Sequence, residues 1–215
     1  MTKKILITGA NGQLGHEMRN ALKGNSRFEC IFTDVAELDI CNAEAVKQTI
    51  ADNHIDYIVN CAAYTQVDKA EDNTELCKKI NTDAVENLAR AAADYGARMI
   101  HISTDYVFNG RGYRPYTEDM VPDPQSVYGS TKLEGEKILT DICPESIIIR
   151  TAWLYSPYGN NFVKTMLHLG EEREELSVVA DQIGTPTCAA DLAQAILVIL
   201  QADTFVPGTY HFSDE

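Results

Sequence analysis

Short apolar segments alternate with amphipathic helical segments along most of the chain, and this alternation is the strongest constraint on its fold. The strand-like segments, such as "KKILIT" and "SIIIRT", are rich in β-branched residues and apolar over most of their length. A strand that is apolar on both faces is typical of a parallel sheet covered by helices on both sides. The sequence therefore predicts an α/β fold with a doubly wound parallel sheet of the Rossmann type. Strands are expected at 3–9, 28–34, 56–63, 98–103 and 146–151.

Helices are expected between these strands, at 13–24, 42–53, 81–96 and from 126 onward, with Asn42 as the N-cap of the second. The alternation weakens after residue 151. Residues 177–181 and 189–202 indicate one further strand and helix that return to the sheet. We therefore predict a dinucleotide-binding domain from 1–150 and 177–203. The remainder, 151–176 and 204–215, is expected to form a small substrate-binding region whose C-terminal part is missing from these 215 residues.

A glycine-rich loop joins the first predicted strand to the first predicted helix. Gly9, Gly12 and Gly15 give the spacing G-x-x-G-x-x-G, which differs from the commonest dinucleotide fingerprint. Such a loop makes a tight turn, lets the backbone approach a pyrophosphate and directs a helix N-terminus at the phosphates. A plain turn is the alternative. Asp34 follows the second strand, where an acidic residue would bind the adenosine ribose; capping of a turn is its alternative.

Neither position 35 nor position 36 holds an arginine that would bind a 2′-phosphate. NADH is therefore expected to serve at least as well as NADPH.

Tyr128 and Lys132 lie four residues apart in "SVYGSTKLEGEK", which places both on one face of a helix. We expect the Lys132 cation to lower the pKa of the Tyr128 phenol and make it a proton donor. A nicotinamide cofactor supplies hydride to a carbonyl group, and the carbonyl oxygen then needs a proton. Ser103 and Thr104, at the carboxyl end of the fourth strand, offer a second hydroxyl at the same edge of the sheet.

Charge and cysteine usage narrow the class of partner. The chain carries 32 acidic and 18 basic residues, a net charge of −14, which disfavours nucleic acid and anionic membranes as partners. No segment reads as a signal peptide or a membrane span. The 6 cysteines show no C-x-x-C spacing and are expected to be free thiols in a cytoplasmic protein. His101 is expected to be a strand residue with a hydrogen-bond partner rather than a metal ligand.

Five segments carry a resemblance to a known family: "TGANGQLG", "NCAAYTQVDKAE", "ISTDYVFNG", "VYGSTKLEGE" and "RTAWLYSPYGNNFVKTML". In order and over essentially the whole chain, they resemble the extended short-chain dehydrogenase/reductases and, more narrowly, the dTDP-4-dehydrorhamnose reductases. The resemblance implies NADH- or NADPH-dependent reduction of the 4-keto group of a nucleotide sugar, dTDP-4-dehydro-L-rhamnose, to dTDP-L-rhamnose.

The resemblance also implies roles for individual residues. The implied catalytic residues are Thr104, Tyr128 and Lys132. The implied substrate contacts are Thr104, Asp105 and Trp153, with core packing as the alternative for Trp153. The implied cofactor contacts, besides Tyr128, Lys132 and the flanking glycines Gly9 and Gly15, are Gly12, Gln13 and Leu14 at the pyrophosphate, Asp34, Asp39 and Ile40 at the adenosine, and Ala63, Tyr64 and Thr65 further along.

Some members of this family form a magnesium-bridged homodimer through glutamates. Glu17 matches one such position, but Ala190 occupies another. A homodimer is therefore compatible with the resemblance, while no bound metal is expected.

Two other functions remain open. A nucleotide-sugar epimerase or dehydratase on the same scaffold would keep NAD tightly bound, although a dehydratase would show an acid pair where this chain has Asp105 alone. A non-catalytic NAD(P)-binding module would resemble the regulatory subunit of methionine adenosyltransferase. The presence of Thr104, Tyr128 and Lys132 argues against this second alternative.

Overall fold

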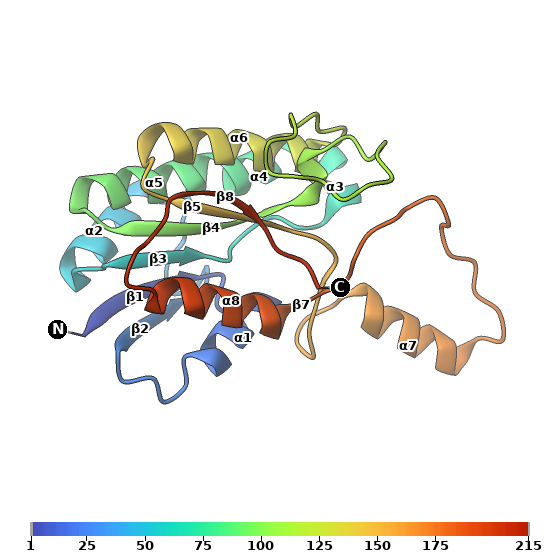
Figure 1. The fold of residues 1–215 in the computed structure, drawn as a ribbon, viewed down its shortest axis with the longest axis horizontal. Helices are drawn as coiled ribbons and strands as arrows, with labels where there is room; N and C mark the ends of the chain where they lie inside the picture. The colour runs from blue at the N-terminus through green and yellow to red at the C-terminus, as the bar shows by residue number, and fades with distance from the viewer. Residues whose placement is uncertain (1, 215) are drawn as a thin grey trace.

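Six parallel strands form the central sheet of the computed structural model, which describes residues 2–214. Their order across the sheet is β2-β1-β3-β4-β5-β8 (Figure 1). From β1 the chain passes to β2 on one side and then returns to build β3, β4, β5 and β8 on the other, so the winding reverses between β1 and β3, as in doubly wound folds. The five predicted strands and the doubly wound fold are confirmed. The strand bounds are β1 (Lys3–Thr8), β2 (Phe28–Thr33), β3 (Tyr57–Asn60), β4 (Arg98–Thr104), β5 (Ile147–Thr151) and β8 (Gly208–His211).

Helices cover both faces of this sheet (Figure 1). On one face, α1 (Gln13–Ala21) packs against α8 (Ala189–Gln201). On the other face, α5 (Ala84–Tyr95) packs between α2 (Ala43–Asn53) and α6 (Val127–Ile142). Two short helices, α3 (Val67–Asp72) and α4 (Thr74–Lys78), continue through the π-helical turn η1 (Lys79–Asp83) into α5. The chain therefore has the three layers that the strand and helix pattern predicts.

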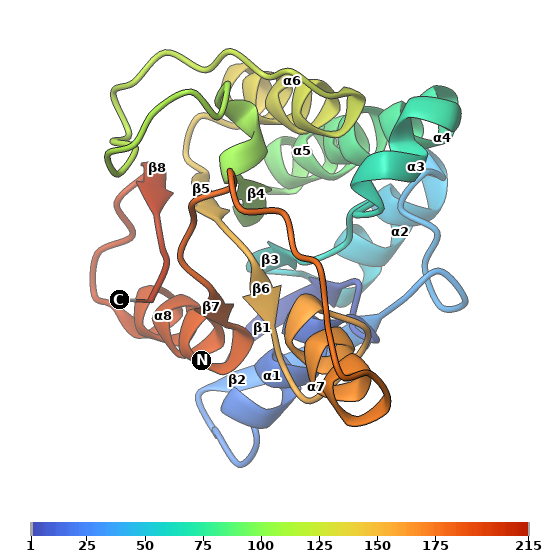
Figure 2. The same ribbon diagram turned by 90° about the vertical axis from the view of Figure 1, so that its right-hand side faces the viewer.

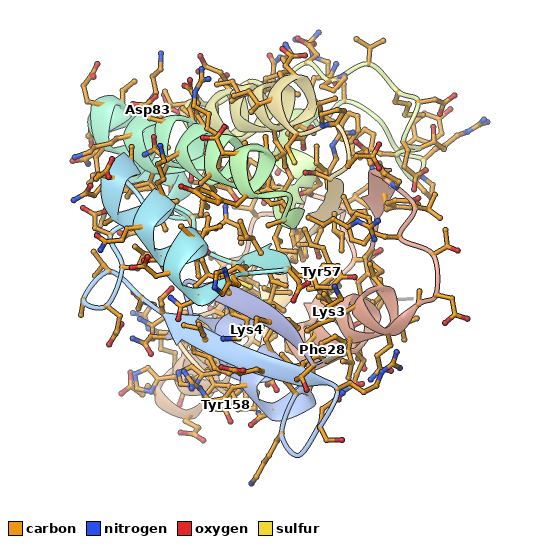
Figure 3. All side chains as sticks on the ribbon, turned by 90° about the vertical axis from the view of Figure 1, so that its left-hand side faces the viewer. Lys3, Lys4, Phe28, Tyr57, Asp83 and Tyr158 are labelled. Carbon is orange, nitrogen blue, oxygen red and sulfur yellow. The ribbon has the colours of Figure 1, made fainter. Side chains whose placement is uncertain are left out.

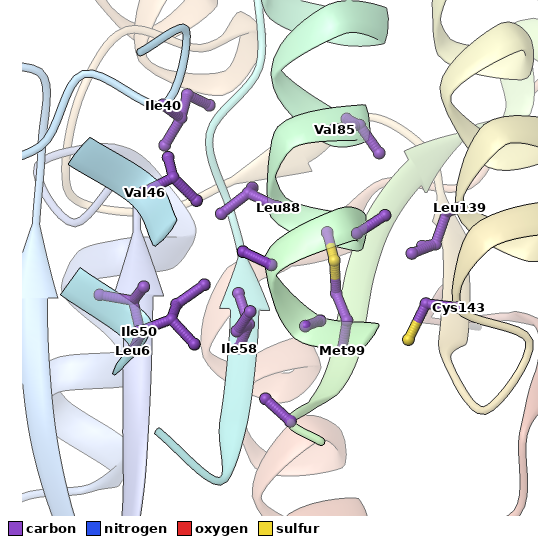
Figure 4. Packing of buried hydrophobic residues seen from close by; sticks show 14 of the residues in the cluster. Leu6, Ile40, Val46, Ile50, Ile58, Val85, Leu88, Met99, Leu139 and Cys143 are labelled. Atoms are coloured by element: carbon purple, nitrogen blue, oxygen red, sulfur yellow. The ribbon is translucent and has the colours of Figure 1, made fainter. Parts of the chain in front are cut away.

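Strands β1 to β5 contribute to two hydrophobic cores because their successive side chains point to opposite faces of the sheet. Leu6 of β1 packs with Ile58 and Met99 beneath α2, α5 and α6 (Figure 4), while Ile5 and Ile7 pack toward α1 and α8. These strand residues are fully buried. Burial on both faces is the physical reason why the strands read as continuous apolar runs.

The amino ends of the strands lie at the edge of the sheet away from the site described below. Lys3 pairs in register with Phe28, and Ile5 with Tyr57; Figure 3 shows Lys3, Phe28 and Tyr57 together at this edge. Lys3 also forms an ion pair with Asp56. Because the strands are parallel, the loop that follows each one emerges at the opposite edge, where the functional residues gather.

Side-chain caps set the start of α2 and α6. Asn42 accepts a hydrogen bond from the Ala45 N–H at 3.1 Å and caps α2, as predicted. Ser126 accepts one from the Gly129 N–H at 3.0 Å and caps α6. An N-cap satisfies a backbone donor that has no partner within the helix. The cap at Ser126 therefore fixes the first turn of the helix that carries Tyr128.

Two predictions about the second half of the chain are wrong. Residues 177–181 form no strand but part of an irregular segment between α7 (Phe162–Glu172) and β7 (Thr187–Cys188). Val178 is 54% exposed, so its apolar side chain has neither a strand partner nor a core to stabilise it. Residues 208–211 form β8, which pairs with β5 at the edge of the central sheet, so this part of 204–215 does not belong to the substrate-binding region.

The remaining elements extend beyond the carboxyl ends of the strands. Strand β6 (Leu154–Tyr155) pairs with β7. Helix α7 lies outside the three layers (Figure 1), so that it stands in front of them when the molecule is turned by 90° (Figure 2). Helix α7 has no fully buried residue. The 3-10 turn η2 (Asp105–Val107) follows β4 at the same edge.

A matched pair of glycine substitutions tests the packing of α6. A Cβ at Gly135 would clash with the Asn81 carbonyl oxygen, whereas a Cβ at Gly170 in α7 would meet nothing within 4 Å. We expect Gly135→Ala to lower the free energy of unfolding by about 1–3 kcal/mol, and Gly170→Ala to raise it by up to about 1 kcal/mol because alanine favours helix. Urea unfolding followed by circular dichroism measures both. Equal stabilisation by the two substitutions would contradict the close approach of α6 to η1.

Candidate active site

A cleft of about 1520 Å³ runs along the carboxyl ends of the strands, from the turn after β1 to α7. This is the edge where open α/β sheets bind ligands. Its volume exceeds the roughly 300–1,000 Å³ that is usual for one small ligand. The cleft is therefore large enough for a dinucleotide together with a second ligand.

The glycine loop forms one end of the cleft. Gly9 has a φ of 64°, and a Cβ there would lie 2.7 Å from the backbone of Ala62, so only glycine is accommodated. Gly9, Gly12, Gln13 and Leu14 line the cleft. Gly12 is also the N-cap residue of α1, whose first turn contains no acidic side chain. The positive end of α1 and uncovered backbone thus face the cleft, as the binding of a pyrophosphate requires.

Gly15 has a different role from the one that the sequence predicted, because it does not line the cleft. A Cβ at Gly15 would clash with the Gly9 carbonyl oxygen and with Ala10. The absence of a side chain at Gly15 allows α1 to pack tightly on the loop. The third glycine therefore shapes the site without facing it.

Asp34 faces the cleft at the end of β2. Its Oδ2 accepts a hydrogen bond from the Asn11 N–H at 2.9 Å, and its Oδ1 accepts one from the Val35 N–H at 2.8 Å. The carboxylate therefore caps the turn, as the alternative interpretation predicted, and it also lines the cleft, where the predicted ribose contact would lie. Asp39 and Ile40 line the same end of the cleft, together with Val35, Leu38 and Lys79, which no sequence motif singled out.

The segment after β3 brings Ala63 and Thr65 to the cleft, but not Tyr64. The Tyr64 side chain instead packs near Ala70, Cys77 and Tyr128. Its backbone is bound on both sides by Asn81, which accepts from the Tyr64 N–H at 2.8 Å and donates to its carbonyl at 3.1 Å. Asn81 lies in the π-helical turn, a geometry frequent at functional sites. Tyr64 therefore supports the cleft from behind.

Thr104, Tyr128 and Lys132 meet at the centre of the cleft, which all three line. Thr104 ends β4, and the other two lie one turn apart on α6. The Thr104 hydroxyl donates to Asp105 Oδ1 at 3.0 Å and accepts from the Tyr106 N–H at 3.2 Å. The Tyr106 ring packs edge-on against Tyr128, with ring centroids 5.5 Å apart. The grouping that the sequence predicted from separate motifs is therefore present.

The prediction that Lys132 lowers the pKa of Tyr128 is wrong. Burial raises the Tyr128 pKa above its ordinary value of 10, although a hydrogen bond with Thr104 acts in the opposite direction. The Lys132 ammonium group does not bond to the phenol: its Nζ donates to the Ile102 carbonyl at 2.7 Å and lies 3.3 Å from His101 Nε2. Burial lowers the pKa of Lys132 itself to about 8. Tyr128 is therefore a fully protonated phenol at neutral pH.

Asp105 and Trp153 line the part of the cleft beyond this centre. Burial raises the pKa of Asp105, and its hydrogen bond from Thr104 partly offsets the rise. Trp153 has a φ of 47° and is 39% exposed. Its ring lies against Gly184 and near Phe162. Core packing is therefore wrong for Trp153, which presents its indole to the cleft.

A hydrogen-bonded link that the sequence did not reveal joins the two ends of the site. Gln13 donates to the Leu154 carbonyl at 3.3 Å and accepts from Asn161 Nδ2 at 2.8 Å. Asn161 also caps α7 through the Lys164 N–H. The side chain of a glycine-loop residue thereby holds the segment that follows Trp153.

The other sequence predictions concern residues outside the cleft centre. The cysteines are free thiols. His101 is fully buried and has polar partners at both ring nitrogens, as predicted. Over residues 2–214, no group of three or more His, Cys, Asp or Glu side chains is placed to hold a metal ion. The described part of the chain also contains no helix that is long and apolar enough to cross a bilayer. Glu17 accepts a hydrogen bond from Asn20.

Comparison with known proteins gives consistent matches. The family model described as the RmlD substrate binding domain matches residues 3–215. A dTDP-4-dehydrorhamnose reductase of Aggregatibacter actinomycetemcomitans is 44% identical over 216 residues, covering 99% of this chain and 74% of the relative. One from Escherichia coli K12 is 47% identical over 215 residues, covering 96% and 71%.

Similar solved structures bear the same name as these sequence relatives. The structure of a dTDP-4-dehydrorhamnose reductase from Clostridium acetobutylicum matches with a TM-score of 0.94 at 50% identity, covering 99% of this chain and 74% of that one. The Bacillus anthracis dTDP-4-dehydrorhamnose reductase in complex with NADP matches with a TM-score of 0.96 at 44% identity, covering 100% and 75%.

Proposed function

The chain belongs to the family of the RmlD substrate binding domain, and on this basis we propose that it reduces the 4-keto group of dTDP-4-dehydro-L-rhamnose to dTDP-L-rhamnose with NADH or NADPH. The observation that carries the proposal is the meeting of Thr104, Tyr128 and Lys132 in the cleft that the glycine loop opens. Relatives that cover nearly the whole chain at 44–47% identity bear the name of this reductase.

The glycine-loop end of the cleft suits a nicotinamide dinucleotide. Gly9 and Gly12 present bare backbone, and the N-terminus of α1 carries no acidic side chain that would repel phosphate. Gly12, Gln13 and Leu14 would hold the pyrophosphate, with Asp34, Asp39 and Ile40 at the adenosine and Ala63 and Thr65 further along. When bound, the cofactor supplies a hydride. Lys132 would hydrogen-bond the ribose next to the nicotinamide.

The opposite end of the cleft would hold the sugar. The Thr104 hydroxyl orients the keto oxygen, and Tyr128 donates a proton to that oxygen as it gains negative charge. The raised pKa of Tyr128 keeps the phenol protonated until this moment. If its Nζ moves from the Ile102 carbonyl toward the cleft, the Lys132 ammonium would stabilise the phenolate that remains. Asp105 binds sugar hydroxyls, and the Trp153 indole covers one face of the hexose.

Substrate-dependent loss of NADH or NADPH absorbance tests the proposed function. We expect oxidation with dTDP-4-dehydro-L-rhamnose and none with dTDP-glucose, which has no keto group to reduce. Chromatography should identify dTDP-L-rhamnose as the product. Absence of cofactor oxidation by a folded, cofactor-binding protein would contradict the reductase.

Two further features belong to this proposal. A cytoplasmic location suits free cysteines and an enzyme that draws on the cellular pools of nicotinamide cofactor and nucleotide sugar. A homodimer is compatible with the family, and light scattering coupled to gel filtration would give the mass that decides between one and two copies.

The choice between the two cofactors is expected to depend on Asp34. Its carboxylate faces the adenosine end of the cleft and would repel the 2′-phosphate of NADPH. We expect Asp34→Ala to raise the ratio of kcat/KM for NADPH to that for NADH by about tenfold, equivalent to ~1.4 kcal/mol. Asp52→Ala, which removes an exposed carboxylate from α2, is the matched control and should leave the ratio unchanged. An unchanged ratio in both variants would show that Asp34 only caps the turn and has no part in cofactor choice.

A further inference from the structure

A buried chain of hydrogen bonds leads from the end of β3 through β4 to Lys132. Asn60 Nδ2 lies 3.0 Å from His101 Nδ1, and His101 Nε2 lies 3.3 Å from Lys132 Nζ. Asn60 and His101 are 0% exposed and Lys132 is 1% exposed. The proposed function gives Asn60 and His101 no part. A fully buried imidazole that contacts a catalytic amine nevertheless affects which protonation states that amine can adopt.

The orientation of the Asn60 amide is fixed by its other partners. Its Oδ1 accepts a hydrogen bond from the Ala62 N–H at 3.2 Å and one from the Thr8 hydroxyl at 2.7 Å. A backbone N–H can only donate, so the amide oxygen must face Ala62. The NH₂ group of Asn60 consequently faces His101 and donates to its Nδ1.

The tautomer of His101 follows from this orientation. Nδ1 accepts a hydrogen bond and therefore carries no proton. Burial lowers the pKa of His101 well below its ordinary value, and the Lys132 charge lowers it further, so the ring is neutral. A neutral imidazole carries one proton, which must then be on Nε2. The ring therefore presents an N–H donor, and not a lone pair, to Lys132 Nζ.

This donor distinguishes the two forms of Lys132. An ammonium has three donors and no acceptor, so it would face the His101 N–H donor to donor. A neutral amine accepts from His101 Nε2–H with its lone pair, donates to the Ile102 carbonyl at 2.7 Å and keeps one N–H for the cleft. All of the polar contacts around Nζ are satisfied only in the neutral form.

We propose that His101, held in its Nε2–H tautomer by Asn60, is a positioning residue that disfavours the ammonium form of Lys132 at this location and directs that charge toward Tyr128 and the cleft. The role of Lys132 in turnover rests on the proposed function. The hydrogen-bond chain itself does not.

Other charged groups near Lys132 do not replace this effect. Glu136, on the same helix, raises the Lys132 pKa, but its two carboxylate oxygens already bind Arg150 of β5 at 3.0 and 2.6 Å. Cys77 of α4 also raises it. Burial outweighs both and brings the Lys132 pKa to about 8. Substitution of Asn60 leaves Glu136, Arg150 and Cys77 in place, so their effects on the Lys132 pKa stay unchanged.

The tautomer is directly measurable by nitrogen-15 NMR of the protein labelled at its histidine rings. The signals of His101 are identified as those that disappear in His101→Phe. We expect a neutral ring protonated at Nε2 across the neutral pH range. A ring protonated at Nδ1, or at both nitrogens, would overturn the proposal. This measurement needs no substitution in the protein that is observed and no substrate.

Asn60→Asp reverses the donor-to-acceptor direction of the hydrogen bonds from residue 60 through His101 to Lys132, with almost no change in side-chain size. A carboxylate still accepts from the Ala62 N–H and the Thr8 hydroxyl, but it can only accept from His101. His101 would then be protonated at Nδ1 and would offer the Nε2 lone pair to the Lys132 ammonium. We expect the Lys132 pKa, followed by the NMR shift of its side chain, to rise by at least about 1 unit, a tenfold gain in proton affinity.

The same substitution also adds a negative charge. Repeating it in a protein that already carries His101→Phe separates the effect of this charge from the effect of the His101 tautomer. In His101→Phe the ring nitrogens are absent, so Asn60→Asp acts there only through space. We expect a clearly smaller rise of the Lys132 pKa in that background, whereas an equal rise would overturn the role of His101. Thr8→Val, which leaves the direction of the chain intact, should not move the pKa. A protein without reductase activity would refute the proposed function and leave these NMR results readable.

Discussion

Replacing Tyr128 with phenylalanine is expected to lower turnover by about 10²- to 10⁴-fold, the usual effect of losing a general acid, while cofactor affinity stays within a few-fold. Phenylalanine keeps the ring that packs against Tyr106 and the cluster around Ala70 and Cys77, so the cleft should retain its shape. Only the proton donor is lost. Steady-state kinetics with saturating NADPH, together with a fluorescence titration of the cofactor, measures both quantities.

Tyr106→Phe is the matched control for this substitution. Tyr106 also lines the cleft, and burial raises the pKa of its phenol as well. Its hydroxyl has no assigned role, so turnover should stay within a few-fold of the unsubstituted protein. Full turnover in Tyr128→Phe, or equal losses in the two variants, would show that the proton comes from another group.

Lys132→Met is expected to abolish most activity and to stabilise the fold. The lysine is buried, and its pKa is about 8 in the folded protein against an ordinary value of 10.5. The unfolded chain therefore binds this proton more tightly, which costs the folded state up to about 3 kcal/mol below pH ~8. This cost decreases as the pH rises toward the pKa that Lys132 has in the unfolded chain. Methionine removes it, so the free energy of unfolding should rise at neutral pH.

Urea unfolding at neutral pH and again near pH ~10 tests this sign, because the gain should shrink at the higher pH. Lys137→Met, an exposed position on the same helix, should leave activity and stability almost unchanged. A loss of stability in Lys132→Met at neutral pH would mean that the hydrogen bond to the Ile102 carbonyl outweighs the burial of the charge.

Those parts of the fold that depend on local pattern could be predicted from the sequence. Strands such as Ile147–Thr151 are apolar because both of their faces are covered, and the helix cap at Asn42 is a local interaction. The glycine loop and the Tyr128–Lys132 spacing indicated the site because their geometry is set within one turn. The family and the fold were confirmed by the comparisons and the structure.

The sequence failed wherever the outcome depends on a distant partner. Residues 177–181 include strand-forming residue types but have no neighbouring strand with which to pair. Glycine is needed at position 15 because a side chain there would clash with Gly9 and Ala10. The Tyr128 pKa depends on burial and on where the Lys132 side chain points, which the spacing of the two residues does not determine. The contacts of Asn81, Gln13 and His101 join segments far apart in sequence, so no motif reveals them.

Isotopically labelled cofactor shows directly whether hydride passes from the cofactor to C4 of the sugar. The protein is supplied with NADPH deuterated at C4 of the nicotinamide, each face in turn, and with dTDP-4-dehydro-L-rhamnose. We expect dTDP-L-rhamnose that carries deuterium at C4 of the sugar from one of the two labelled cofactors, with one equivalent of oxidised cofactor released per sugar. An epimerase or dehydratase would return its hydride to the same sugar. A nucleotide sugar recovered without deuterium, from either labelled cofactor and with no cofactor consumed, would contradict the proposed reductase.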